Sequence, residues 1–226
     1  MNSRNIVDAI RQYRIISILR GLEPGQTLPA VKALYKGGGR LLEITFAQHS
    51  PTMLEDTASA IRSAREEFGS AIMVGAGTVL TCEQADVAAR AGAEFLLSAT
   101  CDEQVIRRAK ALGIGMIPGA MTPTEIEHGY RWGADVIKVF PAGNLGQGYL
   151  KSIRAPLSHI PMIAVGGVEV GNLYDFWDAG MLGAGIGASL ASPEVIRRGD
   201  WEELTRRAAR YCEAVERYAE QKEHGR

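Results

Sequence analysis

Residues 88–118 read AARAGAEFLLSATCDEQVIRRAKALGIGMIP, and this stretch sets the pattern for the whole chain. A helical pattern ends in glycine, a short apolar run covers Glu94–Ser98, and a second helical pattern covers Asp102–Leu112. Glycine just beyond a helix adopts the left-handed backbone that stops it. The same ending recurs in ALYKGGG before Arg40. The stretch therefore predicts helices and strands in alternation.

Eight short apolar runs alternate with longer amphipathic runs along the chain. Strands that alternate with helices pair in parallel, and eight such units favour closure into a barrel over an open doubly wound sheet, which is the alternative. We therefore predict one α/β domain over residues 1–226, a (β/α)8 TIM barrel with an extra N-terminal helix before Ile15 that covers its bottom. The predicted strands are Ile15–Leu19, Leu41–Phe46, Ala71–Gly75, Glu94–Ser98, Gly115–Pro118, Val136–Phe140, Met162–Val165 and Ala184–Gly187. The predicted helices include Pro51–Phe68, Cys82–Ala91, Asp102–Leu112, Pro123–Trp132, Val170–Ala179 and Trp201–Glu220.

Composition narrows the class of protein. The formal net charge of -1 provides no basic surface for a nucleic acid. No apolar run approaches the roughly 18 to 20 residues that cross a bilayer, and the polar start MNSRNIVDAIRQYR lacks the regions of a secretory signal. Three cysteines without paired metal-ligand spacing indicate reduced thiols. We expect a cytoplasmic protein with no nucleic acid partner, no membrane partner and no metal site.

The run Val136–Phe140 contains a lysine among large apolar residues. Alternation along a strand places Val136, Lys138 and Phe140 on one face. If that face points into the barrel, desolvation lowers the pKa of Lys138 and makes its amine a nucleophile towards a ketone. The alternative is a lysine at a strand end whose amine reaches solvent. The apolar flanks favour the catalytic interpretation.

The run Leu41–Phe46 repeats this pattern, with Leu41, Glu43 and Thr45 on one face. Glu43 close to Lys138 could be a structural ion-pair partner, or it could carry protons during imine formation. Two further polar side chains follow strand ends. Thr78 either donates a hydrogen bond in the pocket or caps the next helix, and Arg20 is a candidate clamp for a substrate carboxylate or phosphate.

Glycines follow the last two predicted strands, as Gly166 and Gly167 in AVGGV and as Gly187 in GIGAS. Glycine lets the backbone approach a ligand closely, and the loops after strands seven and eight commonly bind phosphate in barrels. Plain tight turns are the alternative. We favour an anion site to which Ser189 donates its hydroxyl.

The chain resembles the 2-keto-3-deoxy-6-phosphogluconate and 4-hydroxy-2-oxoglutarate aldolase family over about Ile15 to Ser192. The matching segments are ILRG, LLEITF, GAGTVLT, MIPGAMTPTE, VIKVFPAG, AVGGV and GIGASL. The resemblance implies a class I aldolase without a cofactor, in which Lys138 forms the Schiff base and Glu43 is the general acid and base. It further implies a homotrimer, a pocket lined by Arg20, Thr45, Thr78, Pro118 and Phe140, and phosphate bound by Gly166, Gly167, Gly187 and Ser189.

Three positions depart from the family pattern. Ala47 stands where many members carry arginine, so the carboxylate clamp must come from elsewhere. Ala99 and Thr100 follow Ser98 where a proline is usual, and Val165 stands where a threonine often contacts phosphate. These departures concern the aldehyde product more than the imine chemistry.

We expect cleavage of a 2-keto-3-deoxy-6-phospho sugar acid or of 4-hydroxy-2-oxoglutarate to pyruvate and an aldehyde, glyceraldehyde 3-phosphate or glyoxylate. The protonated imine accepts the electrons of the broken C3–C4 bond, so the reaction needs neither a metal nor an organic cofactor. The alternatives are an aldolase for another 2-keto-3-deoxy acid, a phosphate-binding isomerase with Glu43 as base, and a non-catalytic regulator that binds sugar phosphates.

Overall fold

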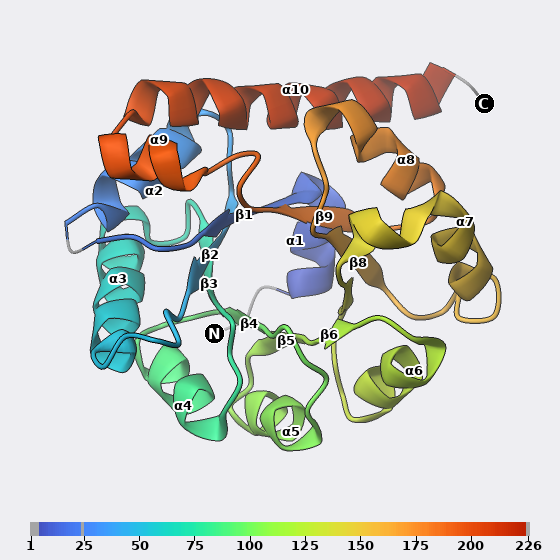
Figure 1. Ribbon diagram of the computed structural model, residues 1–226, viewed down its shortest axis with the longest axis horizontal. Coiled ribbons are helices and arrows are strands. Elements are labelled where there is room, and N and C mark those ends of the chain that lie inside the picture. The colour runs from blue at the N-terminus through green and yellow to red at the C-terminus, as the bar shows by residue number, and fades with distance from the viewer. Residues whose placement is uncertain (1–4, 24, 225–226) are drawn as a thin grey trace.

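A computed structural model describes residues 5–23 and 25–224 of the chain; residues 1–4 of the predicted N-terminal segment lie outside the described residues. Helices surround a ring of parallel strands (Figure 1). The sheet order is β5-β4-β3-β2-β1-β9-β8-β7-β6. The strands are β1 Ile15–Leu19, β2 Leu41–Thr45, β3 Met73–Gly77, β4 Phe95–Leu97, β5 Gly115–Ile117, β6 Gly119–Ala120, β7 Ile137–Val139, β8 Met162–Val165 and β9 Gly183–Ile186.

The two ends of this order, β5 and β6, are consecutive in the chain and separated only by Pro118. The first half of this bent segment pairs with β4 and the second half with β7. Proline has no N–H to donate to a ladder, so the pairing changes partner where Pro118 interrupts it. The eight predicted strand segments thus form the TIM-like α/β barrel that the sequence predicts, nearly closed, with the predicted fifth strand Gly115–Pro118 ending at Ile117 and followed by the short strand β6.

The third strand is shifted by two residues from the predicted Ala71–Gly75, to Met73–Gly77. Ala71 belongs to the preceding turn, where its N–H bonds to the carbonyl of Phe68 at 2.9 Å. Glycine usually weakens a strand. Here Gly75 and Gly77 face the barrel interior, where the Phe95 ring and the Glu43 carboxylate, respectively, occupy the space of a side chain. Tertiary packing therefore decides where this strand ends.

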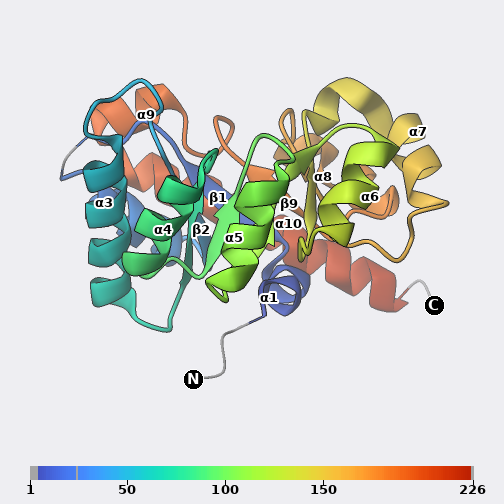
Figure 2. The same ribbon diagram turned by 90° about the horizontal axis from the view of Figure 1, so that it is seen from below.

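The inside of the barrel is filled by apolar side chains from alternate strand positions. They form one cluster with Ile6 and Ile10 of α1, which spans Ile6–Tyr13. Figure 2 shows α1 at one end of the barrel. A side chain at Gly115 or Gly183 would collide with Ile6 or Ile10, respectively. The predicted N-terminal helix is thus confirmed as the cover of the bottom, and the opposite end remains for a site.

Helices cover the outside of the barrel. They are α2 Thr27–Lys36, α3 Met53–Phe68, α4 Cys82–Arg90, α5 Glu103–Ala111, α6 Pro123–Arg131, α7 Ala142–Arg154, α8 Leu173–Asp178, α9 Pro193–Arg198 and α10 Trp201–His224, with a short 3₁₀ helix at Val170–Asn172. The predicted helix Val170–Ala179 is therefore divided into a 3₁₀ turn and α8. Among these described helices, none combines the length and the apolar character required to cross a membrane.

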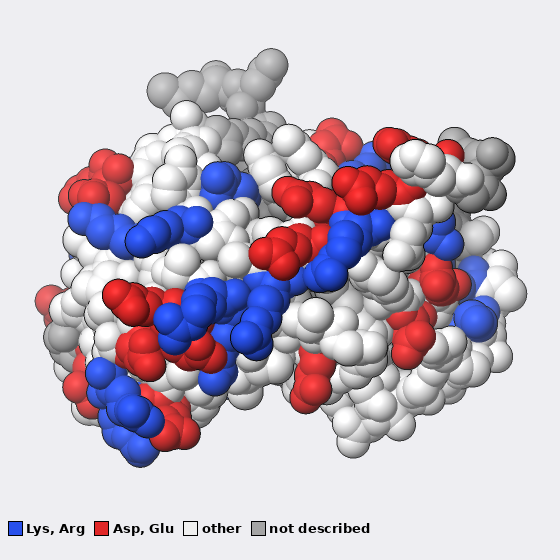
Figure 3. Space-filling model, turned by 90° about the horizontal axis from the view of Figure 1, so that it is seen from above, with Lys and Arg blue, Asp and Glu red and all other residues white. Residues whose placement is uncertain are grey.

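The long helix α10 runs along the outside of the barrel, at the upper edge of Figure 1, and packs on α2 and α9. Its buried face includes Leu204, Ala208, Tyr211 and Ala214. Figure 3, seen from above, shows Lys and Arg beside Asp and Glu in a band across the outer surface on this side of the molecule. Pairs such as Arg207 with Glu203 lie four residues apart, the spacing at which side chains on a helix are neighbours. The helix is therefore amphipathic, with its apolar side towards the barrel.

Candidate active site

Lys138 lies on β7 and points into the barrel. Val136, two residues before it, belongs to the interior cluster, and Lys138 is only 6% exposed. Its N–H donates to the carbonyl of Pro118 at 2.9 Å, and its Nζ lies 4.7 Å from the centroid of the Phe140 ring. Burial lowers the pKa of Lys138 below that of an ordinary lysine; Arg20 acts in the same direction and Glu43 in the opposite one. The amine is therefore poised to lose its proton.

Glu43 lies on β2 between Ile18 of β1 and Gly75 of β3, and is 1% exposed. A side chain at Gly77 would overlap its carboxylate, so glycine at that position makes room for it. Burial raises the pKa of Glu43, while Lys138 and Arg20 pull it back down. A raised pKa makes the Glu43 carboxylate a stronger base than an exposed glutamate.

Two buried oxygens at this mouth, Oε2 of Glu43 and Oγ1 of Thr45, have no hydrogen-bond partner among the described residues. Most buried polar atoms in proteins are hydrogen-bonded, and exceptions concentrate where a ligand or water completes the set. Both atoms belong to the β2 face that the sequence assigned to the barrel interior. The unpaired oxygens therefore mark the space beside Lys138 as a place for a polar ligand.

Arg20 and Thr78 meet above Glu43 and Lys138. Nη2 of exposed Arg20 donates to Oγ1 of Thr78 at 3.4 Å. Thr78 has φ +56°, a left-handed backbone that costs a β-branched residue free energy. Thr81, not Thr78, caps α4, so the capping interpretation of Thr78 is wrong. Arg20 and Thr78 thus form one polar edge of the mouth.

Two glutamines, for which no function was predicted, stabilise this edge by hydrogen bonds. Gln48 donates to the carbonyl of Thr78 at 2.8 Å and accepts from the buried side chain of Gln84 at 2.9 Å. Gln84 in turn accepts from the N–H of Leu80 at 2.6 Å. Gln48 stands next to Ala47, where many family members carry arginine. A glutamine within an amphipathic helix carries no signal in the sequence that its side chain is buried.

Phe140 and Pro118 lie in different surroundings, although both were predicted to line the pocket. The ring of Phe140 is 38% exposed and lies between the Lys138 amine and Gly166. Pro118 is buried, and its ring lies near Gly129 of α6, outside the barrel. Successive residues of a strand face opposite sides of the sheet. Because Ile117 faces the barrel interior, the next residue, Pro118, faces outward. Its contribution near the site is therefore the carbonyl that holds the Lys138 backbone.

The loops after β8 and β9 lie at the part of the mouth between β7 and β1. Gly166 and Gly167 have φ +86° and +72°, values that other residues rarely adopt. The carbonyl of Gly166 accepts from the N–H of Gly143 at 2.8 Å, at the start of α7. A side chain at Gly187 would meet no atom within 4 Å, and the N–H of Ala188 has no acceptor in the described chain. This open, N–H-lined loop suits an anion.

Ser189 differs from the sequence prediction. Its hydroxyl donates to the carbonyl of Val168 at 3.0 Å and accepts from the hydroxyl of Tyr211 at 2.9 Å. A serine hydroxyl has one proton, and here that proton is directed to the protein. Ser189 was predicted to donate its hydroxyl to an anion, whereas in the structure it donates to the Val168 carbonyl. The missed residue is Tyr211, which is distant in sequence from both loops.

Comparisons with known proteins agree with this geometry. The family model described as KDPG and KHG aldolase matches residues 6–207. The 2-dehydro-3-deoxy-6-phosphogalactonate aldolase of Escherichia coli (strain K12) is 39% identical over 78% of this chain and 83% of its own. A KDPG aldolase of Legionella pneumophila, solved with pyruvate captured as a covalent carbinolamine intermediate, is 25% identical with a TM-score of 0.80, covering 90% of this chain and 96% of that one. A designed cube-shaped protein cage made by fusing symmetric oligomeric domains is 34% identical with a TM-score of 0.84, covering 94% of this chain and 76% of that one.

The match covers the barrel from α1 to the early part of α10 and includes both sides of the mouth. In this chain a lysine and a glutamate are both buried inside a parallel barrel whose mouth also carries two glycine-containing loops. The chain belongs to the KDPG and KHG aldolase family.

Proposed function

We propose that this protein is a class I aldolase that cleaves a 2-keto-3-deoxy-6-phospho sugar acid to pyruvate and a phosphorylated aldehyde, with Lys138 as the residue that forms the imine. The observation that carries the proposal is the position of Lys138, whose amine is buried inside an apolar barrel with a lowered pKa. A surface lysine would be protonated and inert towards a ketone at neutral pH.

The chemistry follows from an amine with a lowered pKa in the same barrel interior as a carboxyl group. Nζ of Lys138 attacks the C2 carbonyl to form a carbinolamine, and loss of water forms the protonated imine. The C4 hydroxyl then loses its proton as the C3–C4 bond breaks, the aldehyde departs, and the bond's electrons move to the iminium to form an enamine. Protonation at C3 and addition of water release pyruvate and restore the amine. The water lost in the first half returns in the second, so the reaction is a simple retro-aldol cleavage.

Glu43 is our candidate for the proton transfers. It is buried on the interior face of β2 with one unpartnered oxygen, and burial raises its pKa. A raised pKa makes a carboxyl group a better base than an exposed glutamate. Thr45, Thr78 and Arg20 supply hydrogen-bond donors around the same space, and we assign them to the substrate carboxylate and carbonyl.

We assign the distal phosphate of the substrate to the loops after β8 and β9. The Phe140 ring lies between Lys138 and Gly166, so one ligand that passes this ring reaches both sides of the mouth. The E. coli relative named as a 2-dehydro-3-deoxy-6-phosphogalactonate aldolase supports a phosphorylated substrate of this length. A panel of 2-keto acids with and without a terminal phosphate, assayed for pyruvate release, identifies the preferred substrate. Equal rates for both classes would contradict the phosphate assignment.

Reductive trapping tests the covalent step. Sodium borohydride added with pyruvate should reduce the imine to a stable secondary amine, which increases the mass of the protein and maps to the peptide with Lys138. The trap should fail when pyruvate is omitted. An unmodified Lys138, under conditions that label a known imine aldolase, would overturn the proposal.

We further propose a cytoplasmic homotrimer in which residues 1–226 act as one domain. The similarity to a cage built from symmetric oligomeric domains supports an oligomer. Sedimentation equilibrium should give three times the 24.4 kDa of one chain. A monomer at micromolar concentration would contradict the assembly but not the chemistry.

A further inference from the structure

We propose that Tyr211 of α10 is a positioning residue for the phosphate subsite, acting through Ser189 to hold the loop after β9 against the loop after β8. The inference rests on the proposed function, in which these two loops bind the distal phosphate. Nothing in the barrel sequence points to Tyr211, and the family model ends at residue 207, before it.

The contact is a short chain of hydroxyl groups. The Tyr211 hydroxyl donates to Oγ of Ser189 at 2.9 Å, and Ser189 donates to the carbonyl of Val168 at 3.0 Å. Ser189 belongs to the loop after β9, whereas Val168 directly follows Gly166 and Gly167 in the loop after β8. Two hydrogen bonds therefore connect both loops with α10. These bonds hold the backbone N–H groups of one loop at a fixed distance from those of the other.

The direction of these bonds depends on Tyr211. Because Oγ of Ser189 accepts a hydrogen bond from the phenol, its own hydroxyl proton is directed to the carbonyl of Val168. Tyr211 is 3% exposed, and burial raises the pKa of its phenol against the opposing effect of hydrogen bonds with Ser189 and the Val170 backbone. The phenol therefore stays protonated and remains a donor over the physiological pH range.

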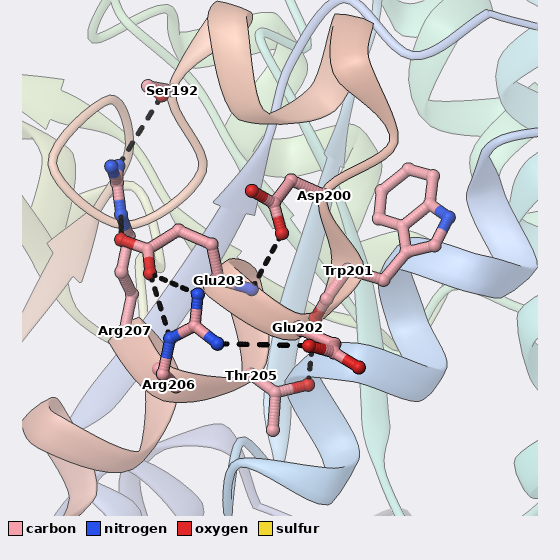
Figure 4. A network of polar contacts seen from close by, with 8 residues as sticks. All are labelled: Ser192, Asp200, Trp201, Glu202, Glu203, Thr205, Arg206 and Arg207. Atoms are coloured by element: carbon pink, nitrogen blue, oxygen red, sulfur yellow. Dashed lines mark hydrogen bonds and ion pairs between the residues drawn. The ribbon is translucent and has the colours of Figure 1, made fainter.

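The start of α10 is anchored independently, which fixes where Tyr211 points. Figure 4 shows Arg207 directed to Ser192, with Glu203 accepting from both Arg206 and Arg207. Ser192 follows the β9 loop and caps α9. The N–H of Glu203 is capped by Asp200 at 3.1 Å. These bonds join the first turns of α10 to the chain that leaves the β9 loop, so Tyr211 one turn later lies opposite Ser189.

A second feature of this region is a hollow of about 380 Å³ behind the loops, lined by Glu169, Ser189, Arg207, Arg210 and Tyr211, among others. Loops beside a hollow are not held by close packing, so the hydroxyl chain contributes more to their position than it would in a filled core. The backbone donors of an anion site act best when they are already fixed before the ligand arrives.

Tyr211→Phe is the test, because it removes one oxygen and keeps the ring. Inorganic phosphate is the first probe, since its binding needs no aldol chemistry. We expect its affinity to fall about three- to tenfold, the usual consequence of losing one hydrogen bond, and KM for a phosphorylated substrate to rise by a similar factor. Borohydride trapping of pyruvate should not change, because pyruvate has no phosphate to place.

Tyr218→Phe is the matched control on the same helix. Its hydroxyl donates to Asp178 at 2.8 Å, away from both loops, and its loss should leave phosphate affinity unchanged. In a Ser189→Ala background, Tyr211→Phe should have little further effect, because the tyrosine acts through the serine.

The outcomes separate the two proposals. Unchanged phosphate affinity in Tyr211→Phe, or an equal loss in Tyr218→Phe, would overturn the role of Tyr211. A wild-type protein that traps pyruvate on Lys138 but binds no phosphate would also overturn it and would leave the imine mechanism standing. Conversely, borohydride could fail to trap pyruvate on Lys138 while Tyr211→Phe, and not Tyr218→Phe, weakens phosphate binding. That result would overturn the aldolase mechanism and support the positioning role of Tyr211.

Discussion

The imine side of the barrel mouth, on β2 and β7, and the phosphate side, on the loops after β8 and β9, are built by different means. On β2 and β7 the proposed functional groups are side chains, Glu43 and Lys138, which are held by the strands of the barrel itself. On the loops after β8 and β9 they are backbone N–H groups beside Gly166 and Gly187, held by contacts from α10. A side-chain site is specified by which residue stands on which strand face, whereas a backbone site is specified by loop conformation. The first side should therefore tolerate no change of its residues, and the second should respond to changes made at a distance.

The largest expected effect is that of Lys138→Arg. Arginine keeps a positive charge but cannot form an imine, because its guanidinium stays protonated. We expect pyruvate release to fall by at least about 1000-fold. The control is Lys110→Arg, whose lysine pairs with Asp135 on the surface. Appreciable activity in Lys138→Arg would favour an isomerase-like role in which the lysine acts only by its charge.

Glu43→Gln should reduce kcat by about 100- to 10,000-fold, the usual contribution of a general acid–base residue. Because the buried carboxylate has a raised pKa and an unpartnered oxygen, the neutral amide should not lower the melting temperature. The surface change Glu67→Gln removes a pair with Lys32 and serves as control. A Glu43→Gln enzyme that keeps the wild-type kcat would remove Glu43 from the mechanism.

Gly187→Val sharpens the contrast between the two sides. A side chain there meets no protein atom within 4 Å, so the variant should fold and the new methyl groups should occupy the proposed phosphate space. We expect KM for a phosphorylated substrate to rise about tenfold or more, while pyruvate trapping at Lys138 is preserved. Gly148→Val, on α7 and equally open, is the control. An equal loss of both readouts would show that the two sides are not separable.

The smallest effect is a shift in pH dependence for Arg20→Met. The positive charge of Arg20 lowers the pKa of Lys138, so its removal should raise that pKa. The amine then needs a higher pH to lose its proton, and the rate of pyruvate trapping against pH should move upward at saturating pyruvate. Arg11→Met, at the opposite end of the barrel and paired with Asp8, should leave the profile in place. A downward shift in Arg20→Met would contradict the electrostatic assignment.

Much of the fold and of the imine side was predictable from local patterns. Period-two alternation in Val136–Phe140 and Leu41–Phe46 placed Lys138 and Glu43 inside the barrel, and the structure places them there. The end of β3 was harder to predict. The alternation of residues cannot show that Phe95 and Glu43 occupy the space beside Gly75 and Gly77. The outward turn of Pro118 likewise depends on how the fifth strand divides to close the sheet.

The sequence by itself determined the alternation of strands and helices, the parallel barrel and the residue types of the imine side, because these depend on spacing within single elements. Only the tertiary structure decided where the ring closes, which way the Ser189 proton points, and that Tyr211 meets a loop 22 residues earlier. Those features are contacts between distant segments. Their free energies depend on distances and burial that no local pattern contains.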